Sequence, residues 1–348
     1  MKAVLGDVLQ AARRARGLRQ PEVAEAAGVT QAALSRYEND QRTPEPEVLA
    51  RLASALGVTP ELLESAGRIR GAMAVDAHMR RRQTAKPTVW RQLEAQLNMY
   101  RLHTRHLLEE VGLHAEQIVP RFDPVETPAS DAARLVRMQW RMPVGPVRDL
   151  AGWMEAAGCV LIEQNFDTAR VDGLSQWVED HPVVMLNRPS PTDRKRLTMS
   201  HELGHLCLHS IDVTEDVEAE ANAFAAEFLM PAVTIRPQLR NLTIGKLYDL
   251  KREWGVSMQA LIERAYSLNV MTATQRTSLY KRFSSMGWRT REPVSDELPP
   301  EDARLTRRIG DVLAEKGLTP AEIARLAGFA DAETEHPFRP SGPRLRTV

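Results

Sequence analysis

Short apolar stretches with helical spacing, separated by glycine and proline, begin the chain and predict a bundle of short helices. One face of the first helix carries Leu5, Val8, Leu9 and Ala12. Pro21 suits the first turn of the next helix, where its missing N–H is not needed. Gly28 permits a tight turn, and Thr30 is a suitable N-cap for a third helix. Residues 1–66 are therefore expected to form an all-α helix-turn-helix domain.

A polar, Arg-rich segment follows over residues 67–125, and its apolar positions again have helical spacing. These positions are Trp90, Leu93, Leu97, Tyr100, Leu107 and Leu108. Prolines at 120, 124 and 128 end this helical linker. The basic cluster Arg80–Arg82 with Lys86 is best interpreted as a solvated helix face, and contact with phosphates is the alternative.

The pattern becomes mixed over residues 126–272, which are expected to form a separate α+β domain. Helices are predicted at 128–139 and 147–157. Apolar runs at 159–163, 173–178 and 183–186 predict strands, and helices follow them. Residues 273–348 are expected to form a partly helical C-terminal region. The architecture as a whole is predicted to be multidomain and mainly α.

Part of the C-terminal region is similar in sequence to the N-terminus. Residues 310–313 and 317–324 resemble residues 6–9 and 17–24. A second helix-turn-helix is one interpretation. An ordinary capped helix pair is preferred, because no clear recognition helix follows Phe329.

Composition limits the class of protein. The 348 residues have a formal net charge of +0, so DNA binding must come from a local patch and not from a polycation. Two cysteines exclude a disulfide framework. The N-terminus lacks the apolar core of a signal peptide, and no run is long enough to span a bilayer. We expect a cytoplasmic protein with no membrane partner.

The third predicted helix has the pattern expected of a helix that contacts DNA bases. It buries Leu34 and Tyr37 and leaves polar positions outward, where Gln31 can pair with adenine and Arg36 can reach guanine or phosphate. Residues 5–64 resemble the Xre, lambda-repressor-like helix-turn-helix family. The resemblance implies a buried Arg13–Glu38 pair and a set of DNA-contacting positions: Gln20, Thr30, Gln31, Ala32, Ser35, Arg36 and Arg42. The alternative is a helical bundle that binds only protein.

A metal-binding motif occurs at His201-Glu202-Leu203-Gly204-His205. On a helix, residues i and i+4 share a face, so both histidines can bind one ion. Glu202 can then take a proton from a zinc-bound water. Two surface histidines are the alternative, but flanking leucines indicate a buried helix, and buried histidines need a partner.

Residues 196–209, together with the block 218–231, resemble the ImmA/IrrE family of metallopeptidases over residues 128 to about 265. The resemblance implies a gluzincin-like α+β fold, in which a small, mostly antiparallel sheet packs against a helix pair that carries Zn²⁺, with Mn²⁺ as the alternative ion. Many members are fused to an Xre-type domain. Known members cut one repressor or antitoxin near its DNA-binding domain.

Glu218 is the expected third ligand, and Glu220 is the runner-up. In a helix from about 214 to 230, Glu218 falls within an apolar arc made by Val217, Ala221, Phe224, Ala225, Phe228 and Leu229. A carboxylate there needs a metal or another partner. Asn222 lies one turn after Glu218 and is expected to support a ligand from the second shell. His209 is the other second-shell candidate, although a surface histidine is equally consistent with the pattern.

Together these features predict a DNA-binding regulatory zinc metalloendopeptidase involved in stress response or a toxin–antitoxin system. Its expected partners are operator DNA and a repressor or antitoxin as substrate, and homodimerisation is open. One alternative is a transcriptional regulator whose peptidase-like domain senses a ligand or protein without proteolysis. Another is an antitoxin-like binding protein.

Overall fold

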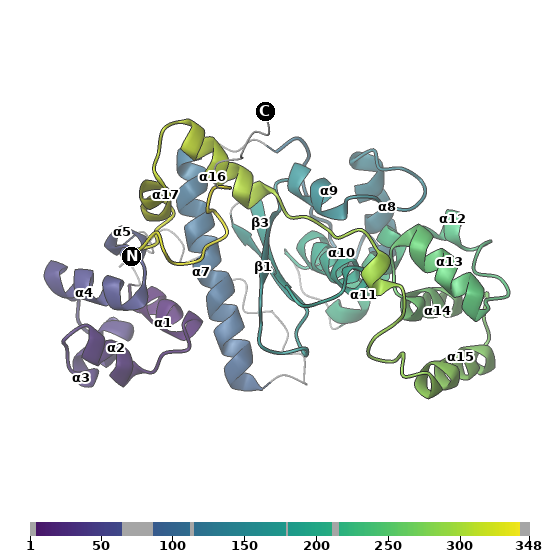
Figure 1. Cartoon of the computed structure of the whole chain (residues 1–348), viewed down its shortest axis with the longest axis horizontal. Coiled ribbons are helices and arrows are strands. Elements are labelled where there is room, and N and C mark those ends of the chain that lie inside the picture. The colour runs from purple at the N-terminus through teal and green to yellow at the C-terminus, as the bar shows by residue number, and fades with distance from the viewer. Residues whose placement is uncertain (1–4, 65–85, 112–114, 179, 211–215, 342–348) are drawn as a thin grey trace, which may run out of the picture. The chain divides into compact units, whose positions relative to one another are not determined.

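A computed structural model describes residues 5–64, 86–111, 115–178, 180–210 and 216–341 (Figure 1). The chain forms two compact units. Unit 1 contains residues 1–114, 158–185 and 304–348, and unit 2 contains residues 115–157 and 186–303. The segments expected over residues 67–125, 126–272 and 273–348 are therefore each divided between the two units. Among the described residues, no helix is both long and apolar enough to cross a membrane.

The N-terminal part of unit 1 is the expected bundle of short helices. Their bounds are α1 Leu5–Ala15, α2 Gln20–Ala26, α3 Gln31–Glu38, α4 Pro46–Leu56 and α5 Pro60–Glu64. The side chain of Thr30 accepts a hydrogen bond from the backbone N–H of Ala33, so this residue caps α3 as predicted. Arg51 donates to the carbonyl of Ala27 and ties α4 to the turn after α2.

Helices α1 and α3 approach closely. A Cβ atom at Gly6 would lie only 2.6 Å from the carbonyl oxygen of Glu38, so a glycine is required there. Arg13 and Glu38 form the expected pair, with 2.6 Å between Nε and Oε1 and with the Glu38 side chain 1% exposed. Removing either partner would leave the charge of the other one buried and unpaired, so the pair holds the two helices together.

The predicted helical linker corresponds to α7, Pro87–Val111, the long helix that contributes to all three hydrophobic cores described for unit 1. Met99 and Leu102 belong to the core of the helix-turn-helix. Leu97 belongs to a second core under the sheet, and Leu107 to a third among the C-terminal helices. The basic cluster Arg80–Arg82 lies outside the described residues.

Three strands form a small mixed sheet in the order β1-β3-β2. Their bounds are β1 Val160–Gln164, β2 Gly173–Val178 and β3 His181–Asn187, as predicted to within a few residues. Alternate residues of β2 are buried, as expected for a strand with one face on a core. Within unit 1, α7 packs against β2, and α16 (Leu305–Glu315) packs against β1.

The C-terminal segment that is similar in sequence to the N-terminus is a helix pair, α16 and α17 (Pro320–Leu326). Thr319 and Glu322 form a capping box at the start of α17. Gly310 lies against the backbone of Phe338, much as Gly6 lies against Glu38. No third helix occurs over residues 327–341, so the preferred interpretation as a helix pair is confirmed.

His103 on α7 holds this C-terminal segment through stacking and a hydrogen bond. Its ring stacks on Phe329 at 3.9 Å and 11°, and its Nδ1 lies 2.7 Å from the carbonyl oxygen of Ala327. Burial lowers the pKa of His103 from 6.5 to about 4.

Acid should therefore destabilise unit 1. The unfolded chain takes up a proton below pH 6.5, whereas folded His103 resists it until about pH 4, so stability is present at neutral pH and falls across this window. The shift corresponds to a loss of roughly 3 kcal/mol. Urea unfolding at pH 7.5, 5.5 and 4.5 measures this loss. A His103→Leu variant should show a flatter pH dependence, and an unchanged slope in that variant would contradict the assignment.

Unit 2 is almost wholly helical. Its elements are α8 Ala129–Gln139, α9 Leu150–Ala156, α10 Thr192–Leu208, α11 Val217–Leu229, α12 Ala232–Ile235, α13 Ile244–Trp254, α14 Met258–Ser267, α15 Ala273–Ser285 and the 3₁₀ helix η2 Ser295–Glu297. Its core is built on contacts among α8, α10 and α11. Buried Lys251 bonds Asp193 at 2.6 Å and Glu292 at 2.8 Å, which fixes the start of α10.

Candidate metal centre and DNA-reading helix

Helix α10 is buried on most of its surface, as its leucines indicated. Leu203 and Leu208 are 0% exposed and Leu206 is 3% exposed. His201 and Glu202 are also buried, at 5% and 8%. Cys207 is a free thiol within the core and takes no part in the site. Two adjacent polar residues buried to this extent require partners. Two of the partners of His201, Asn222 and Glu218, come from α11.

Gly204 brings α10 and α11 together. A Cβ atom there would lie 3.1 Å from Cβ of Phe224 and 3.2 Å from Cα of Ala221, which is tighter than ordinary packing. The small residue inside the motif thus sets the distance between the helix with the histidines and the helix with the glutamates.

Alanine at Gly204 should therefore be destabilising. Gly245 on α13 is the matched control, because a Cβ atom there meets nothing within 4 Å. Both changes gain helix propensity, but Gly204→Ala also overpacks α10 against α11. We expect Gly204→Ala to be about 1–3 kcal/mol less stable than Gly245→Ala in thermal unfolding. Equal stability of the two variants would show that the helices move apart without cost.

Three side chains converge between α10 and α11: His201, His205 and Glu218. The two Nε2 atoms are 3.0 Å apart. Glu218 places Oε2 3.6 Å from Nε2 of His201 and Oε1 3.4 Å from Nε2 of His205. The structure thus brings together the three residues that the sequence analysis named as candidate metal ligands.

The hydrogen bonds of His201 set its tautomer. Its Nδ1 lies 3.0 Å from Oδ1 of Asn222, and an amide oxygen only accepts. Nδ1 must therefore carry the proton, and the lone pair of Nε2 faces the carboxylate of Glu218. Asn222 lies where the prediction of an outer-shell residue placed it.

A second chain of hydrogen bonds orients His205. Nε2 of His209 donates to Oε2 of Glu220 at 2.7 Å, since a carboxylate only accepts. Burial lowers the pKa of His209, so its ring is neutral and its Nδ1 is an acceptor. Nδ1 of His205 then donates to Nδ1 of His209 at 3.0 Å. The lone pair of Nε2 on His205 consequently points toward the same space as that of His201.

Glu218 and Glu220 thus have different surroundings. The contacts with His201 and then with His205 lower the pKa of Glu218 well below its usual range. Burial does not distinguish the two residues as the apolar arc suggested, because the Glu218 side chain is 38% exposed and that of Glu220 is 26% exposed. The arc itself is buried. What separates the two glutamates is the histidine that each one meets.

The donor set suits a divalent metal. Two imidazole nitrogens and a carboxylate face one another. A cation bound between them would interact favourably with all three. Tetrahedral zinc with bonds of about 2.0–2.1 Å separates its ligand atoms by about 3.4 Å, close to the spacings of 3.0, 3.4 and 3.6 Å here.

Helix α3, the candidate DNA-reading helix, buries and exposes the residues expected from its pattern. Leu34 and Tyr37 are buried, while Gln31, Ala32 and Arg36 are exposed and Ser35 is partly exposed. Arg42 is exposed in the following loop. Gln20 is engaged within the domain, because its Nε2 donates to Oε2 of Glu38 at 2.9 Å. The side chain of Thr30 is likewise used as the cap of α3.

Two family models match parts of the chain. Residues 154–266 match the family model of the IrrE N-terminal-like domain, from a peptidase family. Residues 9–63 match the model of a helix-turn-helix. The chain joins an IrrE-like domain to an N-terminal helix-turn-helix domain. A search of curated proteins found no match.

The IrrE-like match includes α10 and α11 and therefore all three converging side chains. It begins within α9, so α8 lies outside it, although the sequence resemblance extended to residue 128. The role of Glu220 as partner of His209 was not predicted. The spacing of four residues between His205 and His209 was the available signal, since it places both rings on one helix face.

Proposed function

We propose that this chain is a DNA-binding regulatory zinc metalloendopeptidase that cuts one specific partner protein, a repressor or an antitoxin. The observation that carries the proposal is the convergence of His201, His205 and Glu218 beside Glu202. A structural role for these residues would not require a glutamate next to the first histidine, at a position that is 8% exposed.

The residues have separate tasks in the proposed reaction. His201, His205 and Glu218 would hold zinc, which supplies Lewis acidity to the scissile carbonyl and to the attacking water. Glu202 accepts the proton of that water on a carboxylate oxygen and delivers it to the leaving amine. Asn222 and the His209–Glu220 pair keep the two histidine rings in the tautomers described above.

The helix-turn-helix is proposed to bring the peptidase domain to operator DNA, where a repressor substrate is concentrated. Contacts from α3 would read bases and Arg42 would contact the phosphate backbone. This arrangement would make cleavage local and selective, so broad protein digestion is not expected.

The two kinds of DNA contact should be separable by substitution. In the full chain, Gln31→Ala is expected to relax sequence preference by about 1–3 kcal/mol at one base pair. Arg42→Ala should weaken binding to all duplexes and reduce the salt slope by about 1. Fluorescence anisotropy with duplexes selected from a random pool measures both, and Arg308→Ala on α16 is the control. Loss of preference in Arg42→Ala with retention in Gln31→Ala would reverse the roles.

The proposed proteolysis can be tested in the native host. Cells expressing the chain and cells expressing Glu202→Gln are compared by mapping newly formed protein N-termini. Cleavage of one DNA-binding protein, present only with the unaltered chain, supports the proposal. Identical N-termini in both strains, together with unchanged control of transcription by the Glu202→Gln variant, would show a regulator that acts without proteolysis.

A further inference from the structure

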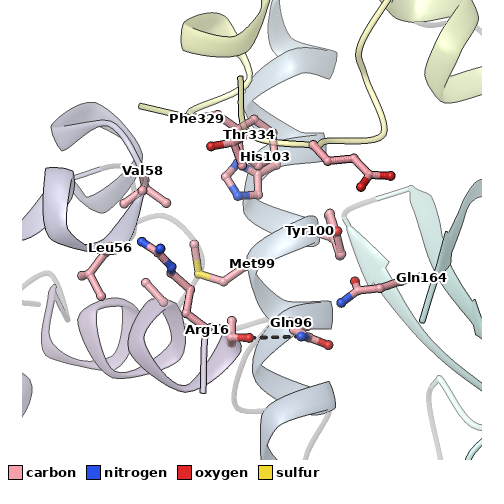
Figure 2. A pocket seen from close by; sticks show the side chains of 14 residues that line it. Arg16, Leu56, Val58, Gln96, Met99, Tyr100, His103, Gln164, Phe329 and Thr334 are labelled. Carbon is pink, nitrogen blue, oxygen red and sulfur yellow. Dashed lines mark hydrogen bonds between the residues drawn. The ribbon is translucent and has the colours of Figure 1, made fainter. Parts of the chain in front are cut away.

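A cavity of about 250 Å³ lies within unit 1, remote in sequence from the metal centre. Its walls come from α1, the segment after α4, α7, the end of β1 and the stretch from Phe329 to Glu335 (Figure 2). Figure 2 shows Met99, Tyr100 and His103 on α7 across from Arg16, Leu56 and Val58 of the helix-turn-helix. The volume is slightly below the range of about 300–1,000 Å³ for drug-sized ligands, which indicates a small metabolite.

His103 gives this cavity a specific polar requirement. Only 3% of its surface is exposed. Its Nδ1 donates to the carbonyl oxygen of Ala327, because that oxygen can only accept. The ring is neutral at physiological pH, since burial lowers its pKa to about 4. Nε2 is therefore an acceptor, and it has no hydrogen-bond partner among the described residues. Figure 2 shows the ring edge facing the space beside the helix-turn-helix.

His103 lines the cavity and Nε2 is an acceptor, so the site favours a ligand with an N–H or O–H group. The cavity also exposes an oriented guanidinium. Arg16 donates one N–H to the carbonyl of Ala55, which holds the side chain at the rim and leaves other N–H groups for a carboxylate.

The remaining lining restricts the ligand further. Glu335 also lines the cavity, and its negative charge disfavours a dianion while tolerating a ligand that carries its own cation. Leu56, Met99 and Phe329 provide an apolar surface between these polar groups. The ligand should therefore carry a carboxylate, an N–H donor and an apolar body. An α-amino acid with an apolar side chain has all three.

We propose that this cavity binds an apolar α-amino acid, with its carboxylate on Arg16 and its ammonium donating to His103, and that occupancy changes the DNA affinity of the helix-turn-helix. The proposed effect on DNA affinity follows from the elements that line the cavity. A ligand in the cavity would contact α1, α7 and the segment after α17 simultaneously. Such a ligand stabilises one arrangement of the helix-turn-helix against α7. If that arrangement differs in DNA affinity, ligand and DNA must affect each other by the same factor.

Calorimetric titration of the full chain tests the binding. The probes are L-leucine, L-methionine and L-phenylalanine, with the corresponding amines, which lack the carboxylate, and the corresponding α-keto acids, which lack the ammonium. We expect at least one amino acid to bind with a submillimolar dissociation constant and its two analogues to bind at least about tenfold more weakly, a difference of 1.4 kcal/mol. The absence of binding by all three amino acids at 10 mM would overturn the proposal.

Variants locate the site. Arg16→Gln changes an exposed residue and should fold normally, and it should weaken binding about tenfold or more. His103→Phe removes Nε2 while keeping an aromatic ring beside Phe329, with circular dichroism as the check on folding. Arg308→Gln on α16 is the matched control and should bind like the unaltered chain. Undiminished binding in Arg16→Gln would place the ligand elsewhere and overturn the assignment.

Regulation is tested separately by fluorescence anisotropy on a selected duplex, with and without the bound amino acid. We expect the DNA affinity to change at least about fivefold, the lower end of usual coupling, and Arg16→Gln to abolish the change. Glu202→Gln should respond like the unaltered chain, because proteolysis has no part in the equilibrium. An unchanged DNA affinity at saturating amino acid would refute the regulatory part of the proposal.

Discussion

Replacing Glu202 by glutamine is expected to leave zinc affinity nearly unchanged and to lower the rate of substrate cleavage by about 10²–10⁴-fold. The amide has nearly the size of the carboxylate, but it cannot accept the proton of the attacking water. Glu202 is not among the three converging side chains, so the variant should still bind one equivalent of metal.

The measurement pairs metal analysis with cleavage of the partner identified by N-terminus mapping. Glu253→Gln is the matched control, because Glu253 is an exposed residue of α13 in the same unit. A normal cleavage rate in Glu202→Gln would remove Glu202 from the reaction. Loss of metal from Glu202→Gln would instead make it a ligand or a support of one.

Replacing Glu218 by alanine is expected to weaken zinc binding by more than about 100-fold, whereas Glu220→Ala should weaken it by about 10–100-fold. The reason lies in their contacts. Glu218 faces Nε2 of both His201 and His205, while Glu220 bonds His209. Loss of an outer-shell partner typically costs 10–100-fold in metal affinity, and loss of a direct ligand costs more.

Competition with a chromophoric zinc chelator gives both affinities. Asn222→Ala should behave like Glu220→Ala, because Asn222 also acts on a histidine and not on the ion. Glu253→Ala is the control. The reverse order, with Glu220→Ala the weaker binder, would exchange the two roles and imply that the helices rearrange when metal binds.

Local patterns in the sequence determined most elements of this chain. The periods of 3.6 and 2 residues are properties of the backbone itself, so apolar spacing located α3, α7, α8 and the three strands. The same geometry placed His201 and His205 on one face of α10, because residues four apart always share a face. Caps such as Thr30 are equally local, since the side chain bonds a backbone N–H three residues away.

Only the tertiary structure decided which faces meet. The spacing within α7 showed an apolar surface, but not that it would serve three different cores. Glu218 and Glu220 are two residues apart and chemically identical, and helix phase alone misjudged their burial. Their roles depend on the approach of α11 to α10 at Gly204, which places one glutamate beside His201 and His205 and the other beside His209. Such choices follow from packing between residues distant in sequence, and no local period encodes them.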